Sequence, residues 1–271
     1  NVDISEALMI EGVCGVYIEE DLAKDGVGPL PCTTKFSAEQ PLVLAERFAL
    51  ARKKVRHVGD PIALVIAETE MAAQEGAELV LVDYEALPVV VNPVHAPLDG
   101  SPVIWSTALN NIAYRFKKGE QKKTLVAFGQ AAHIVDLDIE NNRVMALPIE
   151  PRAGIGEYDE QNDIMRLTCT AQGVHAIREQ LAHSVFSLDE ERIQISAPDV
   201  GGGFGLKNFL FPEWVLLLWA SKKYKRAVKW VADRAEDHSA SLHGRDIRTT
   251  AKLALDTEGR FLVLQAKNLP Q

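Results

Sequence analysis

Cysteine is scarce in this sequence, and the few cysteines are irregularly spaced. The 271 residues contain three of them, Cys14, Cys32 and Cys169. An odd number at wide spacing argues against a disulfide framework and against the paired cysteines of metal or redox motifs. We therefore expect buried or half-buried free thiols in a reducing compartment, and we expect this chain to hold no iron–sulfur cluster.

Long apolar runs and basic tracts are also missing. No apolar run approaches the length of a membrane span, and the first residues do not resemble a signal peptide. The formal net charge is −9, and no basic stretch carries interleaved aromatic residues, so nucleic acid is not an expected partner. The acidic charge and the few cysteines predict a cytoplasmic location.

The composition is typical of a globular protein. With 47% hydrophobic and 25% charged residues, a chain of 271 residues is long enough for two domains with substantial cores. The sequence opens on Asn1 without an initiator methionine, and the apolar run 261–265 predicts a strand with almost nothing after it. We therefore expect a piece of a longer polypeptide.

Residues 1–95 predict a small α/β unit. The turn Gly59-Asp60-Pro61 leads into an apolar run over 62–67, which is typical of a strand buried on both faces. Residues 25–41 carry glycine, proline and threonine and predict a loop. Strand, helix and strand with short links favour one α/β layer. The other expected elements are strands over 12–18 and 79–84 and a helix over 71–79 capped by Thr69.

Residues 96–111 predict a linker, and residues 112–271 predict part of a second domain that mixes strands with helices. Asp256-Thr257-Glu258-Gly259 is a good hairpin turn between strands over 249–255 and 260–265. The remaining expected elements are helices over 173–184 and 212–224 and strands over 130–141, 142–147, 164–170, 191–200 and 227–231.

Residues 199–207, with the sequence DVGGGFGLK, form the most unusual stretch. Four of the five positions 201–205 are glycine, and glycine gives up more backbone freedom on folding than other residues do. The stretch connects a predicted strand to a predicted helix, where bare N–H groups can face an anion or an oxygen. A tight turn that needs positive φ angles explains the glycines equally well. The pattern matches neither a Rossmann nor a P-loop motif.

Three further residues are candidates for a site. Gln172 ends a predicted strand and could hydrogen-bond in a cavity without adding charge, or it could cap the next helix or be solvated. Glu150 and Arg152 straddle a proline, so they could anchor separate loops near a site or form ordinary ion pairs, and we favour ion pairs. No nucleophile motif, cysteine–histidine pair or carboxylate pair can be argued from spacing, so spacing identifies no general base.

Several segments together resemble one family. Residues 55–65, VRHVGDPIALV, resemble the VRYVGDPVA-V signature of the α/β hammerhead domain in molybdenum hydroxylase large subunits, and residues 80–88, VLVDYEALP, are similar to its next strand. The segments EPR at 150–152, QGVH at 172–175 and DVGGGFGLK at 199–207 then follow in the order of the molybdopterin-binding domain. The family comprises aldehyde oxidases, xanthine dehydrogenases and aerobic carbon monoxide dehydrogenases, and the likeness covers almost the whole chain.

The resemblance implies an α+β protein, with a hammerhead domain over 1–95 followed after the linker by the N-terminal part of a molybdopterin-binding domain over 112–271. It implies a molybdenum cofactor, either molybdopterin or its cytosine dinucleotide, and hydroxylation with water as the oxygen source. Iron–sulfur and FAD subunits or domains are the implied electron acceptors, in a dimer of heterotrimers. The implied cofactor contacts are Gln172 beside the apical oxygen of molybdenum, main chain at Phe204 and Gly205, and close approach to the pterin at Gly202 and Gly203.

Two departures limit what the resemblance implies. The catalytic glutamate of the family lies beyond residue 271, so we expect no catalytic residue and no direct metal ligand here, and we expect these residues alone to be inactive. Asn208 stands where purine-hydroxylating members carry glutamate, which disfavours purines and leaves an aldehyde, an N-heterocycle or carbon monoxide as the substrate. Two other readings stay open: a non-catalytic assembly module, and an anion-binding α/β protein that uses the glycine loop.

Overall fold

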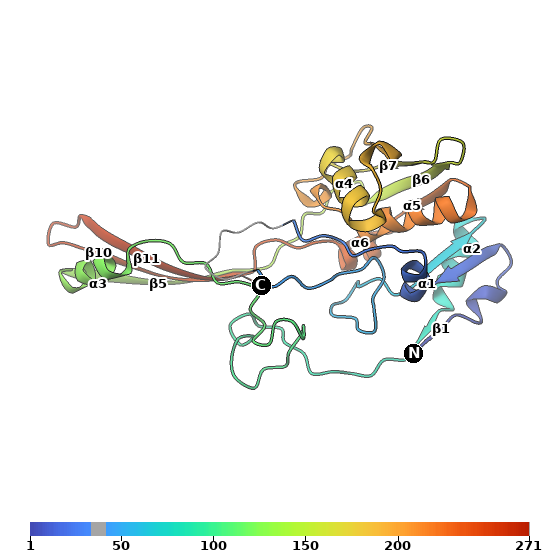
Figure 1. The fold of residues 1–271 in the computed structure, drawn as a ribbon. Helices are drawn as coiled ribbons and strands as arrows, with labels where there is room; N and C mark the ends of the chain where they lie inside the picture. Colours follow the sequence, from blue (N-terminus) through green and yellow to red (C-terminus); the bar gives the residue numbers. More distant parts are fainter. Residues whose placement is uncertain (34–41, 271) are drawn as a thin grey trace. The chain divides into compact units, whose positions relative to one another are not determined.

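The computed structural model describes residues 1–33 and 42–270 (Figure 1). Contacts divide the chain into two compact units, each built from three stretches. The first contains residues 1–32, 46–86 and 145–242, and the second contains residues 33–45, 87–144 and 243–271. Part of the loop predicted over 25–41 lies outside the described residues. Within the described part, no helix is both long and apolar enough to cross a membrane.

A four-stranded sheet forms the centre of the first unit. Its order is β8-β7-β6-β9, with β7 parallel to β8 and β6 antiparallel to both β7 and β9. The strands predicted over 164–170 and 227–231 are confirmed, whereas the strand predicted over 191–200 ends early. The strand bounds are β6 Ala153–Asp159, β7 Ile164–Cys169, β8 Ile193–Ser196 and β9 Val228–Val231.

Helix α5, Pro212–Tyr224, packs directly on this sheet and has the predicted bounds. All of its residues from 212 to 221 are buried, as expected for a helix that is apolar on every side. A Cβ on Gly156 would lie 2.4 Å from the carbonyl oxygen of Leu217, and a Cβ on Gly154 would lie 2.9 Å from its side chain. The small residues of β6 therefore let α5 approach the sheet closely.

A second helical layer completes this core. Helix α4, Val174–Gln180, continues as a π-helical turn over Leu181–Phe186, which confirms the helix predicted near 173–184. Ile177, Leu181 and Val185 are fully buried. Cys169 is buried too, and burial raises the pKa of its thiol to about 12. Cys14 and Cys32 are exposed, so the expectation that every thiol is at least half-buried is wrong for these two.

The first 86 residues contribute two small antiparallel sheets to the same unit. Strand β2 (Val13–Tyr17) pairs with β3 (Leu64–Ala67), and β1 (Val2–Asp3) pairs with β4 (Leu81–Val82), so β3 and β4 do not share the single layer that was predicted. Strand β3 is half-buried rather than buried on both faces.

Two helices accompany these sheets. Helix α2, Glu70–Glu78, begins at the predicted cap, where the Ala72 N–H donates to the Thr69 hydroxyl at 3.2 Å. Helix α1, Glu19–Lys24, follows β2 directly. The ring of Tyr17 in β2 meets Trp219 of α5 edge-on, with ring centroids 4.9 Å apart. These contacts join the N-terminal sheets to the core that surrounds α5.

Gly59, in the turn that closes the VRHVGDP segment, should tolerate no side chain. Its φ is +86°, and a Cβ would lie 2.2 Å from the carbonyl oxygen of Ser239 in α6, Arg234–Ala240. We expect Gly59→Ala to lower the free energy of unfolding by more than the roughly 1–3 kcal/mol that a left-handed backbone conformation costs a non-glycine residue. Urea denaturation measures the change. The control is Gly26→Ala, which has a φ of +76° but no atom within 4 Å of the new Cβ; equal losses would contradict the predicted clash.

A three-stranded antiparallel sheet of order β11-β10-β5 forms most of the second unit. Its strands are β5 His133–Asn141, β10 Ile247–Leu255 and β11 Phe261–Pro270, and helix α3, Gln121–Gly129, contacts β11. The predicted hairpin is confirmed, since Asp256 accepts the N–H groups of Glu258 and Arg260. The strand predicted over 142–147 is wrong: only an isolated bridge joins Val144 to Gly244.

The two faces of this sheet differ. One face carries charges that pair across strands, with Arg248 contacting Asp138 and Glu140 and with Lys252 contacting Asp136. The opposite face is apolar and includes Val135, Leu137 and Leu264, which are each more than half exposed.

Candidate functional site: a glycine loop over a buried ionic network

The glycine loop lies between the end of β8 and the start of α5, as predicted. Positive φ angles occur at Gly202 (98°), Phe204 (49°) and Gly205 (86°). The turn with positive φ angles, one of the two alternatives from sequence, is therefore present. Phe204 is 77% exposed in a conformation that a bulky residue rarely adopts. Strain of this kind clusters at binding and catalytic sites.

Gln172 reaches the loop, although the two are more than 30 positions apart. Its Oε1 atom accepts the N–H of Gly205 at 3.0 Å, and its own N–H donates to the carbonyl of Lys207 at 2.9 Å. A Cβ on Gly203 would lie 2.4 Å from the same Oε1 atom and 2.5 Å from Cδ. Because Oε1 is already bound, the Nε2 amino group of Gln172 is the part available to donate to a ligand.

Three N–H groups of the loop point to an oxygen-rich ligand. Within residues 1–33 and 42–270, no acceptor receives the N–H of Gly202, Gly203 or Phe204. Gly203 is nevertheless buried, and buried N–H groups in native proteins nearly always have a partner. Successive free N–H groups in a turn with positive φ angles form the concave donors that bind anions. The residues present therefore fit a cofactor that carries phosphate or oxo groups.

An ion pair between a buried lysine and a part-buried glutamate adjoins the loop. The side chain of Lys207 is fully buried, and its Nζ donates to the main-chain oxygen and to Oε2 of Glu150, each at 2.9 Å. The same Oε2 atom accepts the N–H of Gly201 at 2.8 Å. Glu150 thus forms an ion pair and also anchors the loop, so both interpretations offered from sequence hold for it.

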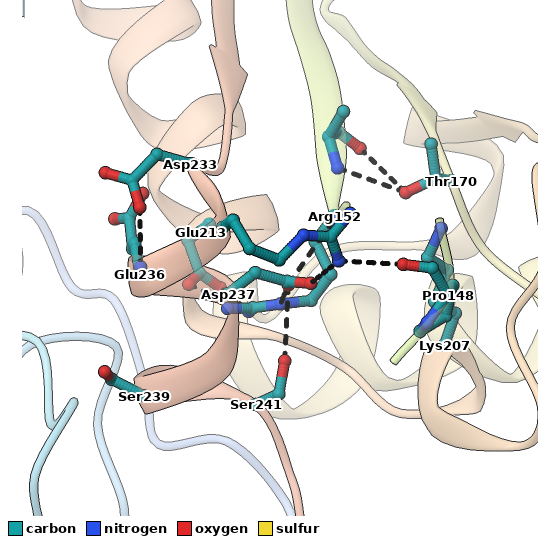
Figure 2. A network of polar contacts seen from close by, with 12 residues as sticks. Pro148, Arg152, Thr170, Lys207, Glu213, Asp233, Glu236, Asp237, Ser239 and Ser241 are labelled. Carbon is teal, nitrogen blue, oxygen red and sulfur yellow. Dashed lines mark hydrogen bonds and ion pairs between the residues drawn. The ribbon is translucent and has the colours of Figure 1, made fainter. Parts of the chain in front are cut away.

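Arg152 is the centre of a second network, which Figure 2 shows together with Lys207. The side chain is fully buried: Nε donates to Asp237 at 2.8 Å, and Nη1 donates to both oxygens of Glu213, at 2.9 and 2.8 Å (Figure 2). Its guanidinium carbon lies 4.3 Å from the centroid of the Phe211 ring. Arg152 therefore joins β6 to α5 and α6.

Two further contacts fix the segment that contains Glu150. Arg234 of α6 donates to the main-chain oxygens of Pro148 and Ile149, and the Ala153 N–H donates to the Thr170 hydroxyl at 3.1 Å. The acceptors Pro148 and Thr170 are labelled in Figure 2. Hydrogen bonds from α6 and to Thr170 thus fix the main chain on each side of Glu150, and they help to hold Glu150 next to the loop.

Sequence reasoning missed the partners in these networks. Glu213 and Asp237 lie 61 and 85 positions from Arg152, and no local spacing relates them. Lys207 lies in the glycine-rich stretch 199–207, and that stretch alone gives its side chain no role. The available signals were this lysine, two residues after Gly205, and the Glu-Pro-Arg segment at 150–152; only the fold pairs them.

Two family descriptions match the chain. The molybdopterin cofactor-binding domain matches residues 104–270, and the a/b hammerhead domain of aldehyde oxidase and xanthine dehydrogenase matches residues 1–88. The nicotine 6-hydroxylase large subunit of Paenarthrobacter nicotinovorans is 34% identical over 263 residues, which are 96% of this chain and 31% of that protein. The carbon monoxide dehydrogenase large chain of Hydrogenophaga pseudoflava is 28% identical over 271 residues, which are 96% of this chain and 32% of that one.

Solved structures of the same family have a similar fold. Quinoline 2-oxidoreductase from Pseudomonas putida 86 is 29% identical with a TM-score of 0.88, over 99% of this chain and 33% of that chain. The Cu,Mo-containing carbon monoxide dehydrogenase is 28% identical with a TM-score of 0.88, over 99% of this chain and 34% of that chain. The domain matches and the shared α+β fold define a molybdopterin cofactor-binding module. The chain belongs to the xanthine dehydrogenase and aldehyde oxidase family of molybdopterin-binding large subunits, and it spans about a third of the length of these relatives.

Proposed function

We propose that this chain is part of the large subunit of a molybdenum hydroxylase that oxidises a small molecule with water as the oxygen source. The observation that carries the proposal is the convergence of Gln172 with a loop whose N–H groups at 202–204 have no acceptor in the described residues. When bound, the molybdenum cofactor supplies the oxidation. A substrate C–H bond and one water give a C–OH group, two protons and two electrons; carbon monoxide and one water give carbon dioxide, two protons and two electrons.

In this proposal each residue of the site has a binding role. Gln172 would donate from its Nε2 group to an oxygen of the bound cofactor, in the orientation fixed by the Gly205 N–H. The main chain at Phe204 and Gly205 would contact the cofactor, and Gly202 and Gly203 would allow the pterin to approach closely. Neutral donors suit this role because a carboxylate would repel an anionic centre.

The substrate class follows from Asn208 and from the relatives. Asn208 is exposed next to the site, since its Oδ1 would lie 3.1 Å from a Cβ on Gly173. A neutral amide in place of the glutamate of purine-hydroxylating members disfavours purines. We propose an aromatic N-heterocycle, an aldehyde or carbon monoxide; relatives named for nicotine, quinoline and carbon monoxide support this set.

The wider assembly is proposed on the same basis. We propose iron–sulfur and FAD subunits as electron acceptors, a dimer of heterotrimers and a cytoplasmic location, and relatives named as subunits of larger enzymes support the partners. We also propose a hammerhead domain over 1–95, a linker over 96–111 and the first part of the cofactor domain over 112–271. Because relatives are about three times longer, we propose that these residues alone bind the cofactor weakly and have no catalytic activity.

Metal analysis of the full-length subunit, purified with its partner subunits, tests the proposal. We expect stoichiometric molybdenum, and a pterin derivative released on oxidation, in the cytosine dinucleotide form or the plain form. A correctly assembled complex that contains neither would overturn the enzyme proposal and would leave an assembly role as the explanation.

A further inference from the structure

One buried cation links the parts of the site. The Nζ of Lys207 contacts the main-chain oxygen and the carboxylate of Glu150, while its own main-chain oxygen accepts the N–H of Gln172. Glu150 in turn accepts the N–H of Gly201, at the start of the glycine loop. Lys207 thus connects Gln172, Glu150 and the loop, and it does so from a position with no solvent exposure.

Stability alone is a weak reason for such an arrangement. A fully buried ammonium group loses its hydration, and replacing a buried ion pair by apolar side chains is often neutral or stabilising. The partners of Lys207, however, are Glu150 in the segment before β6 and the main-chain N–H of Gln172, and Glu150 in turn accepts the N–H of Gly201. Gln172 and the N–H groups of the loop must hold one geometry to meet a ligand, and a network of fixed charges restricts them to it.

We propose that Lys207 and Glu150 are positioning residues, which hold Gln172 and the glycine loop in the geometry that receives the cofactor. This inference rests on the proposed function, because the cofactor is the ligand for which the residues are positioned. The geometry itself is a property of this chain and can be measured whether or not metal is bound.

Hydrogen–deuterium exchange of the full-length subunit, assembled with its partners, is the first test. Lys207→Met removes the ammonium group and keeps a side chain of similar length. We expect the amide hydrogens of Gly201, Gly205 and Gln172 to exchange roughly tenfold faster. Their acceptors are Glu150 Oε2, Gln172 Oε1 and the main-chain oxygen of residue 207, and without the ammonium group these acceptors are no longer held in place. Peptides from β7 and α5 should exchange at the wild-type rate.

The second readout is the cofactor. In Lys207→Met we expect about tenfold less molybdenum per subunit, the lower end of the loss seen when outer partners of a metal site are removed. The remaining metal should give an altered electron paramagnetic resonance signal after reduction. The control is Glu19→Gln, which disrupts a part-buried pair with Arg52 outside the site and should leave the exchange of the loop and the resonance signal unchanged.

The double variant Glu150→Gln/Lys207→Met tests whether the two residues act as one unit. We expect its molybdenum content and loop exchange to match those of Lys207→Met, because the pair is already broken in the single variant. Unchanged exchange at Gly201, Gly205 and Gln172 in Lys207→Met would overturn the inference, as would additive losses in the double variant. A wild-type complex without molybdenum would instead overturn the proposed function, while the exchange rates still decide the positioning role.

Discussion

Replacing Arg152 by methionine is expected to lower the free energy of unfolding by about 3–5 kcal/mol, the usual cost of removing one partner from a buried ion pair. Glu213 and Asp237 would both remain in the core without their cation, since Asp237 is 1% exposed and Glu213 is 9% exposed. Such a loss is a large fraction of the roughly 5–15 kcal/mol that stabilises a typical domain. Urea denaturation of the purified subunit, followed by tryptophan fluorescence, measures it.

Two variants check the cause of this loss. Arg166→Met breaks a pair with Asp159 in which the arginine is 41% exposed, and it should cost less than about 1 kcal/mol. The triple variant Arg152→Met/Glu213→Gln/Asp237→Asn removes the charges together and should recover part of the stability. If Arg152→Met lowers the free energy of unfolding as little as Arg166→Met does, the buried ion pairs of Arg152 do not contribute the predicted stability.

The elements that could be predicted from sequence are those with local signals. Helix α5 was predicted with its bounds because Pro212 suits the first helical turn and the following residues are apolar on every side. The cap at Thr69 and the hairpin at Asp256 depend on hydrogen bonds between residues two to four positions apart. Such short separations can be predicted from the local sequence.

Other elements depended on contacts far along the chain. Strand β6 contains two glycines and two acidic residues in seven positions, a composition that does not predict a strand. Its glycines are explained by the close packing of α5, which lies far along the chain. The charge pairs Glu150–Lys207 and Arg152–Asp237 join residues 57 and 85 positions apart. Gln172 and residues 202–205 were selected through a family likeness, and the fold places them together; their cofactor contacts remain a proposal.

Gly203→Ala is expected to reduce kcat/KM of the full-length enzyme about 100-fold, the scale of loss that a displacement near 1 Å produces in a catalytic site. The new Cβ would lie 2.4 Å from Oε1, 2.5 Å from Cδ and 2.8 Å from Cγ of Gln172, so the amide must leave its place beside the Gly205 N–H. Gly203 itself has no positive φ, and the alanine therefore adds little backbone strain. Steady-state kinetics, normalised to molybdenum content, measures the effect under the proposed function.

A matched glycine and a double variant separate displacement of Gln172 from general damage. Gly129→Ala places a methyl group where no atom lies within 4 Å, and it should leave both activity and stability unchanged. Gln172→Ala should lose as much activity as Gly203→Ala, because both variants remove the same donor. In Gln172→Ala/Gly203→Ala the colliding atoms are already gone, so the second change should add no further loss of activity or stability. If the activity losses of the two single variants multiply in the double variant, Gly203 acts through the pterin or the main chain. The contact with Gln172 would then not explain why residue 203 is glycine.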